Sequence, residues 1–432
     1  MPDDCAMRGV GAAPAGRLRA AWRDALPSTA ARRLVAARAV RSLGQGALSV
    51  DFALYARALH WSPEFLGGVI GAGLLAGAAA TAAIGPLSDR YGRRRFLAGY
   101  EVFAIATALA AVFVSARWPL AAVAAMAGWG RGANGAPVLF GAVEQAWLSR
   151  SVSRRSLTRV FSNNSAAGFF GTAIGMAMGG LPALWAPLLP GPLAYRPLFA
   201  VMALGEAACL FLLLRTPDPR LPPDAAVRAA AAPPAAEPAL RREEHSLLLR
   251  LAGLNAVNGV GIGLTGPLLT WWFAQRYGVG PAVIGPALGA ATIVCGFAAI
   301  GTGLLGSRVG AVGIVVAMRA VGLALLVALP FAPSYPIAVA LYSLRMIVNR
   351  GSAGPRQALA LGLVRPHRRG LAATVNSFSM QVPRAFGPTL AGFLFAAGAL
   401  AAPFMLAAAF QAVYLALYAR FFAAYDPERR GL

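Results

Sequence analysis

Ionisable side chains stand inside long apolar stretches of this sequence, where charge is rare and costly. Asp51 lies in the stretch 34–58, and Arg131 and Glu144 lie in the stretch 118–148. In a hydrocarbon layer such a charge costs about 2.5 to 3.5 kcal/mol on insertion scales, so each residue needs a partner. Asp51 is the first candidate partner for Arg131, and Glu144 is the second. An acid that exchanges an Arg partner for a proton would bind and release protons; the alternative is a static ion pair.

Arginines without acidic neighbours form a second set. No Asp or Glu occurs between His245 and Tyr425, yet Arg345, Arg350 and Arg384 fall within apolar stretches. Backbone carbonyls, water, an acid from the first half of the chain, or a negatively charged ligand could satisfy them. Guanidinium groups bind carboxylate and phosphate through paired hydrogen bonds, which suits the last of these options.

The first apolar stretches of the two halves differ in charge. Arg38, Arg41 and Asp51 align with Asn255, Asn258 and Leu268. We therefore predict that the first half binds protons and that the second half binds an anionic group. The candidate ligand-binding residues are Arg41, Asn255, Asn258, Arg345, Arg350 and Arg384.

The cysteines and histidines lack the spacing of a metal or disulfide site. Cys5, Cys209 and Cys295 lie far apart, and the three histidines are equally scattered. No nucleophile motif or pair of intramembrane acids is visible. We expect no metal, no cofactor and no enzymatic reaction.

The composition places these residues in a membrane. The 432 residues are 58% hydrophobic and 13% charged, with a mean hydropathy of +0.61, and apolar stretches of about 20 residues recur along the chain. The net charge of +23 would suggest a nucleic-acid partner in a soluble protein. Every basic residue is Arg, however, and most stand at the ends of apolar stretches. The predicted partner is a lipid bilayer, not nucleic acid.

Twelve apolar stretches are candidate membrane spans, which predicts an all-α membrane protein. Their approximate bounds are 34–58, 64–87, 95–116, 118–148, 159–181, 195–214, 247–273, 281–305, 312–332, 335–361, 372–396 and 400–420. The domain prediction comprises an N-terminal tail (1–33), a six-helix half (34–214), a polar Pro- and Ala-rich linker (215–246), a second six-helix half (247–421) and a C-terminal tail (422–432).

The arginines also predict the orientation of these spans. Connections around residues 90–95, 150–159 and 365–369 each carry three or four Arg, whereas the alternate connections carry about one each. Because Arg is retained on the cytoplasmic side, both termini and the linker are predicted to be cytoplasmic. The N-terminal tail has no signal peptide pattern, so we expect a multi-pass protein of an inner, or plasma, membrane.

The two halves repeat one another at an offset of about 217 residues. Gly44-Gln45-Gly46 falls on Gly261-Ile262-Gly263, and Arg131-Gly132 falls, with slight drift, on Arg350-Gly351. Several matches in register indicate a duplication. Parallel repeats of this kind place a solute site near the middle of the bilayer, between the halves.

A motif between the second and third spans reads Gly85-Pro86-Leu87-Ser88-Asp89-Arg90-Tyr91-Gly92-Arg93-Arg94-Arg95. It resembles the loop signature of the major facilitator superfamily of secondary transporters, and Arg131-Gly132-Ala133-Asn134-Gly135 is similar to that family's fourth-helix pattern. The resemblance implies a conformational latch at Gly85, Asp89, Arg90, Gly92, Arg93 and Arg94. Gly92 permits a tight turn, which is predicted at this position. Ordinary retention of Arg at the cytoplasmic side is the alternative for the arginines alone.

The resemblance implies the twelve-helix fold of that family and a function. A monomeric secondary active transporter would move a small organic solute by alternating access, with protons as the coupling ion. A proton antiporter that exports drugs or metabolites, and a sensor that binds solute without moving it, are the alternatives. The family places the third and sixth spans at the periphery, so the sequence predicts no role for Glu101 and Glu206.

Overall fold

The computed structural model describes most of the chain and is helical, without a strand among the residues described. These residues are 28–130, 143–145, 147–148, 151–152, 157–217, 238–305, 311–351 and 369–422. For residues 81–91 it describes the backbone alone. The predicted all-α class is confirmed.

Among the residues described in the first half are six long or medium helices and two short ones. They are α2 (Thr29–Ala58), α3 (Pro63–Tyr91), α4 (Arg93–Phe113), α5 (Arg117–Ala127), α7 (Leu157–Met178), α8 (Pro182–Trp185), the 3-10 helix η1 (Gly191–Tyr195) and α9 (Arg196–Leu214). Local signals set several of these ends. The Ser28 hydroxyl accepts a hydrogen bond from the amide of Ala31 at the start of α2, as an N-cap does. Gly92, with a φ of 89°, separates α3 from α4.

In the described part of the second half there are likewise six longer helices and two short ones, in a different order. Its helices are α11 (Pro238–Thr265), α12 (Leu269–Tyr277), α13 (Pro281–Leu305), α14 (Ala311–Ala328), the 3-10 helix η2 (Leu329–Phe331), α15 (Tyr335–Gly351), α17 (Arg369–Ala396) and α18 (Ala402–Phe422). Most bounds agree with the predicted spans; α13, for example, matches 281–305.

Two predicted spans differ from the structure. The span 247–273 is broken between α11 and α12, where Pro267 follows Gly266 and cannot donate a backbone hydrogen bond. The span 118–148 is interrupted after α5, because Gly128 takes a left-handed conformation with a φ of 67°. Both breaks lie inside apolar stretches, so hydropathy does not reveal them.

Six segments in the described part of the chain are long and apolar enough to cross a membrane by length and composition. They are 63–80, 93–113, 163–185, 191–214, 245–277 and 402–422. The chain therefore has spans in both halves, and the total of twelve stays a prediction.

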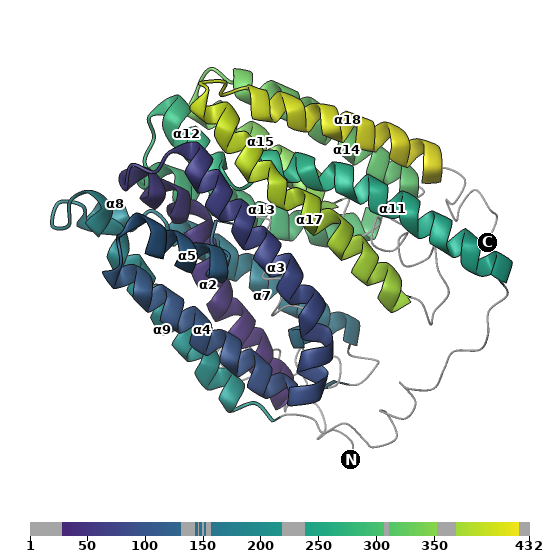
Figure 1. Cartoon of the computed structure of the whole chain (residues 1–432), viewed down its shortest axis with the longest axis horizontal. Coiled ribbons are helices and arrows are strands. Elements are labelled where there is room, and N and C mark those ends of the chain that lie inside the picture. Colours follow the sequence, from purple (N-terminus) through teal and green to yellow (C-terminus); the bar gives the residue numbers. More distant parts are fainter. Residues whose placement is uncertain are drawn as a thin grey trace, which may run out of the picture.

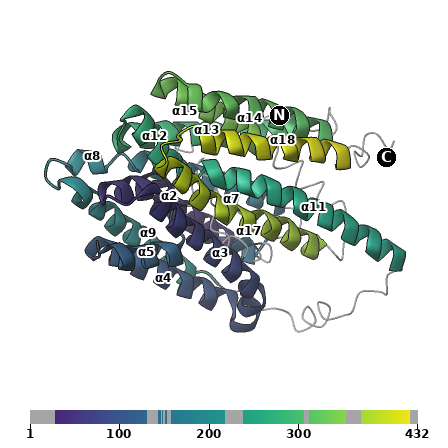
Figure 2. The same ribbon diagram turned by 45° about the horizontal axis from the view of Figure 1, so that its top comes forward.

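Each half is organised around one tightly packed helix pair, α2 with α7 and α11 with α17 (Figures 1 and 2). Gly46 of α2 lies against the backbone carbonyl of Thr172, and Gly263 of α11 lies against that of Arg384, so that a side chain at either glycine would overlap its neighbour. These two glycines are equivalent in the predicted repeat. The small-residue contact that joins the first and fifth spans is thus repeated between the seventh and eleventh.

The halves meet along two further pairs, α3 with α17 and α7 with α13. Figure 1 shows α3 beside α17, and Figure 2 shows the same neighbours. Residues 63–71 of α3 pack against residues 385–392 of α17, with Gly67 against the carbonyl of Pro388 and Gly392 against that of Pro63. Gly285 of α13 packs equally closely on α7. We call the end of the bundle that holds these contacts the closed end.

Candidate functional site

Five ionisable side chains meet inside the first half, from elements far apart in the sequence. Arg38 and Arg41 come from α2, Glu101 from α4 and Glu206 from α9, and Glu144 lies in the helical segment 143–145. Of these, Arg41, Glu101, Glu144 and Glu206 are exposed by 5% or less. We call the five residues the charge cluster. Its charges have been withdrawn from solvent, so they depend on one another.

The arginines of α2 hold Glu144 from two directions. Arg38 Nη1 lies 3.4 Å from Glu144 Oε2, and Arg41 Nη2 lies 3.7 Å from the same oxygen. The Asn164 amide on α7 donates a hydrogen bond of 2.7 Å to the other oxygen, Oε1. Arg41 also reaches Glu101, with Nη1 3.8 Å from Oε1. Arg41 thus lies between two carboxylates.

Glu101 and Glu206 are turned inward, which corrects the expectation that the third and sixth spans place them at the periphery. One carboxylate oxygen from each of them and the Sγ of Cys209 all lie within 4.8 Å of one another. Scattered sequence positions concealed this acid pair, because α4 and α9 run side by side only in the folded bundle. The distances also fit a metal ion, but Arg41 already supplies a positive charge at Glu101.

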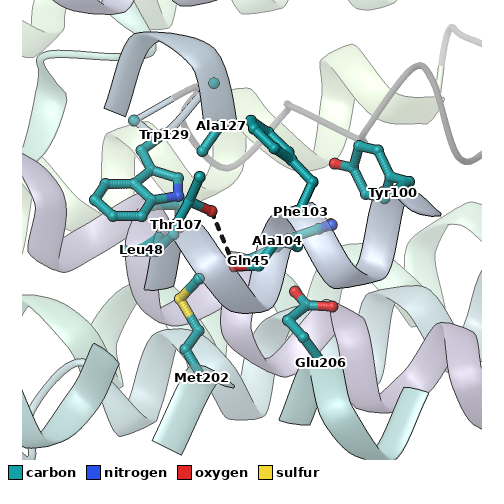
Figure 3. Close-up of a pocket in the computed structure, with 13 residues that line it drawn as sticks. Gln45, Leu48, Tyr100, Phe103, Ala104, Thr107, Ala127, Trp129, Met202 and Glu206 are labelled. Atoms are coloured by element: carbon teal, nitrogen blue, oxygen red, sulfur yellow. Dashed lines mark hydrogen bonds between the residues drawn. The ribbon is translucent and has the colours of Figure 1, made fainter. Parts of the chain in front are cut away.

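A polar cavity of about 70 Å³ opens beside Glu206, between α2, α4, α9 and the turn after α5. Figure 3 shows the Glu206 carboxylate on its floor, with Tyr100 and Thr107 on the α4 side. Gln45 and Ser49 of α2 also line it. The volume exceeds that needed for several water molecules, and the lining offers them hydrogen-bond partners.

Asp51, the first proton-coupling candidate, lies elsewhere on α2. It is 1% exposed, and neither carboxylate oxygen has a hydrogen-bond partner among the described residues. At the helical rise it stands about 15 Å along α2 from Arg41. Its proposed partner Arg131 lies outside the described residues, so that pairing stays a prediction. Glu144, the second proposed partner of Arg131, is paired with Arg38 and Arg41.

Three second-half arginines lie within electrostatic range of one buried tyrosine. Tyr342 on α15 is close enough to interact electrostatically with Arg345, Arg350 and Arg384. Arg345 and Arg384 are buried. The Arg350 guanidinium lies 4.9 Å from the ring centre of Phe169 on α7, a cation–π contact that crosses between the halves.

Asn255 and Asn258 are buried in contacts within the second half. The Asn255 amide donates a hydrogen bond of 3.0 Å to Oδ1 of Asn376 on α17. Asn258 Oδ1 accepts one of 3.3 Å from Arg319 on α14. Arg319 is itself buried beside the Tyr414 ring. The ligand-binding role of Asn255 and Asn258 stays a prediction.

The loop motif is described only in part. Gly92 forms the predicted turn, and Arg94 donates a hydrogen bond to the carbonyl of Leu214, the last residue of α9. Gly85, Asp89 and Arg90 belong to the segment whose side chains lie outside the description, and the latch role of Arg93 stays a prediction.

Apolar spanning helices in two halves, with buried charge inside each half, are typical of a polytopic membrane transporter. The model of the Major Facilitator Superfamily matches residues 34–254, just over half of the chain. The chain belongs to this superfamily, so it is a transporter and not an enzyme. No curated protein sequence matches it.

Solved transporter structures share the fold at low sequence identity. A bacterial homologue of the human lysosomal transporter Spinster, inward-facing and unoccupied, is 15% identical with a TM-score of 0.68, over 94% of this chain and 97% of the homologue. A D-xylose-proton symporter is 14% identical with a TM-score of 0.64, over 88% and 96%. The human organic anion transporter MFSD10 is 18% identical with a TM-score of 0.56, over 90% and 99%. At these identities the likeness concerns the fold alone.

Proposed function

We propose that the chain is a proton-coupled secondary transporter that moves a small organic anion by alternating access. The observation that carries the proposal is the uneven distribution of charge. The acids of the charge cluster belong to the first half, whereas Arg345, Arg350 and Arg384 gather around Tyr342 in the second.

The second-half arginines are suited to an anionic solute. No acidic residue lies between His245 and Tyr425, so the second half cannot neutralise its own arginines. A carboxylate or phosphate on the solute would do so through paired hydrogen bonds. Arg350 contacts the first half through Phe169, which places this charge at the interface between the halves. Arg41 is surrounded by carboxylates and is better suited to an ion-pair role than to solute binding.

The contacts between the halves support alternating access. At the closed end, glycines bring α3 onto α17 and α7 onto α13 with their backbones in close contact. Such an interface can separate as the halves rock about a central site. In the orientation predicted from the arginines, with both termini cytoplasmic, the closed end faces outward. We further propose that the protein is a monomer in an inner membrane.

Purified protein in proteoliposomes tests the proposal. A thermal-shift screen of small carboxylates, phosphates and organic cations first identifies binders, because a bound ligand stabilises the fold. Flux of the best anion is then measured with and without a pH gradient, in wild type, Arg384→Gln and Arg420→Gln. The control residue Arg420 is an exposed arginine near the end of α18.

We expect the pH gradient to drive anion flux in wild type and in Arg420→Gln, and Arg384→Gln to lose at least about tenfold in anion affinity, the effect of one charged hydrogen bond. Binding of cations alone, with gradient-driven exit, would contradict the proposal and identify a drug or metabolite antiporter. Binding without flux would identify a sensor.

A further inference from the structure

The charge cluster contains more negative than positive groups. Arg38 and Arg41 face the carboxylates of Glu101, Glu144 and Glu206. Glu144 is engaged by both arginines and by Asn164. One proton would balance the cluster, and burial makes an unbalanced charge costly.

The proton belongs between Glu101 and Glu206. One oxygen of each carboxylate lies within 4.8 Å of the other. Two ionised carboxylates only accept hydrogen bonds, whereas a protonated one can donate to its neighbour. Among the described residues, both oxygens of Glu101 lack a hydrogen-bond donor, and so does one oxygen of Glu206. Like charges at this distance oppose double ionisation.

The other groups around the pair do not replace that proton. Arg41 from α2 reaches Glu101, but it also serves Glu144. Cys209, one turn along α9 from Glu206, supplies a thiol. Tyr100 on α4 lies beneath the Arg41 guanidinium, with its ring centre 5.9 Å away. From α5 and the turn that follows it, only uncharged residues line the cavity beside the pair.

We propose that Glu101 and Glu206 share one proton and form the protonation site of this carrier, charge-linked through Arg41 to Glu144 and Arg38. This inference rests on the proposed proton coupling and assigns it to a pair that the sequence does not reveal. The Glu206 carboxylate lies on the polar cavity (Figure 3), and water there gives the proton a route to the pair.

The charge cluster has a physical connection to the second half. Arg38 packs against Gly168 of α7, and the next residue, Phe169, carries the Arg350 guanidinium on its ring. Further along α7, Met176 contacts Gly285 of α13 at the closed end. Loss of the proton leaves a net negative charge in the charge cluster, which increases the electrostatic attraction on Arg38. Because Arg38 packs against Gly168, this change also acts on α7.

Infrared spectroscopy of the substrate-free protein tests the shared proton. The measurement uses an Asp51→Asn background, because Asp51 is another buried carboxyl without a hydrogen-bond partner among the described residues. At neutral pH this protein should show the carbonyl band of a buried protonated carboxyl, lost when Glu101→Gln, Glu206→Gln or both are added. The double variant should lose no more than either single variant, because one proton is shared. Glu64→Gln, a carboxyl near the start of α3, is the control and should retain the band.

Additive losses in the double variant, or an unchanged band in both single variants, would overturn the proposal. Thermal unfolding in detergent checks that the variants fold. If Glu101→Gln does not fold, the comparison with Glu206→Gln alone tests the proposal.

Hydrogen exchange tests the connection to the second half. Exchange of residues 168–180 and 281–292, corrected for intrinsic rates, should differ between acidic and alkaline pH in wild type and not in Glu206→Gln. A pH response retained in Glu206→Gln would overturn the connection. Neither measurement uses a transported solute, so failure of the anion assay leaves both results interpretable.

Discussion

Each half has a polar side-chain contact at an equivalent position, but the residue types that form it differ. In the first half, Arg41 of α2 faces Glu101 of α4. At the equivalent point of the second half, Asn258 of α11 faces Arg319 of α14. Both pairs are related by the repeat offset of about 217 residues. The sixth helix contributes in each case, with Glu206 on α9 and, on α18, Gln411, whose amide donates to the Arg319 carbonyl.

The difference teaches what the duplication preserved. The meeting point of the first, third and sixth helices is polar in both halves, but the residues named there include carboxylates in the first half alone. Carboxylates exchange protons near neutral pH when they are paired, whereas an amide does not titrate and an arginine stays protonated. The halves are therefore equivalent in packing and distinct in proton chemistry.

Removing the arginine from each meeting point should give the largest contrast. Arg41→Met removes the cation between Glu101 and Glu144, so we expect a loss of about 3–5 kcal/mol in the free energy of unfolding. Arg319→Met leaves behind the neutral Asn258 and Tyr414, so the loss should be about 1 kcal/mol. Unfolding in detergent measures both. Equal losses would show that the two meeting points do not differ in charge dependence.

Substitution of the equivalent glycines should affect both halves alike. Gly46→Ala and Gly263→Ala each insert a methyl group against a neighbouring helix backbone, and each should cost about 1–3 kcal/mol. Gly253→Ala is the matched control on α11, because no atom lies within 4 Å of an added Cβ; it should stabilise the protein by about 0.4–1 kcal/mol. A large loss in one half only would break the structural equivalence.

The smallest contrast concerns two asparagines. Asn164→Ala removes a hydrogen bond to the Glu144 carboxylate, and a bond to a charged group contributes about 1.5–3 kcal/mol. Asn255→Ala removes a neutral bond to Asn376, which contributes about 1 kcal/mol. The same unfolding assay ranks them. The reverse order would indicate that Glu144 does not depend on Asn164.

Much of the fold was predictable because span positions depend on local hydropathy. The stretch 281–305 coincides with α13, and the turn at Gly92 was expected from its residue type. The break between α11 and α12 was missed because Gly266 and Pro267 stand within a continuous apolar stretch. Helix breakers are tolerated there when neighbouring helices satisfy the backbone.

For the site, the sequence identified some of the residues but not their contacts. Sequence analysis selected Arg41 and Glu144 but could not pair them, and it assigned no role to Glu101 and Glu206. In a soluble protein an apolar stripe reveals which face of a helix is buried. Here lipid is as apolar as the protein interior, so the pattern along α4 and α9 does not show that their acids turn inward.

The contact between α3 and α17 has a consequence for the entropy of closure. Its residues include Pro63, Gly67 and Gly71 on one helix and Ala385, Pro388 and Gly392 on the other. Glycine, alanine and proline lose no rotamer freedom when they are buried. At these six positions, closing the contact therefore immobilises no side chain; the Thr389 hydroxyl, which donates a hydrogen bond to the Gly67 carbonyl, is the side chain ordered beside them. The two states can stay close in free energy while the contact itself remains tight.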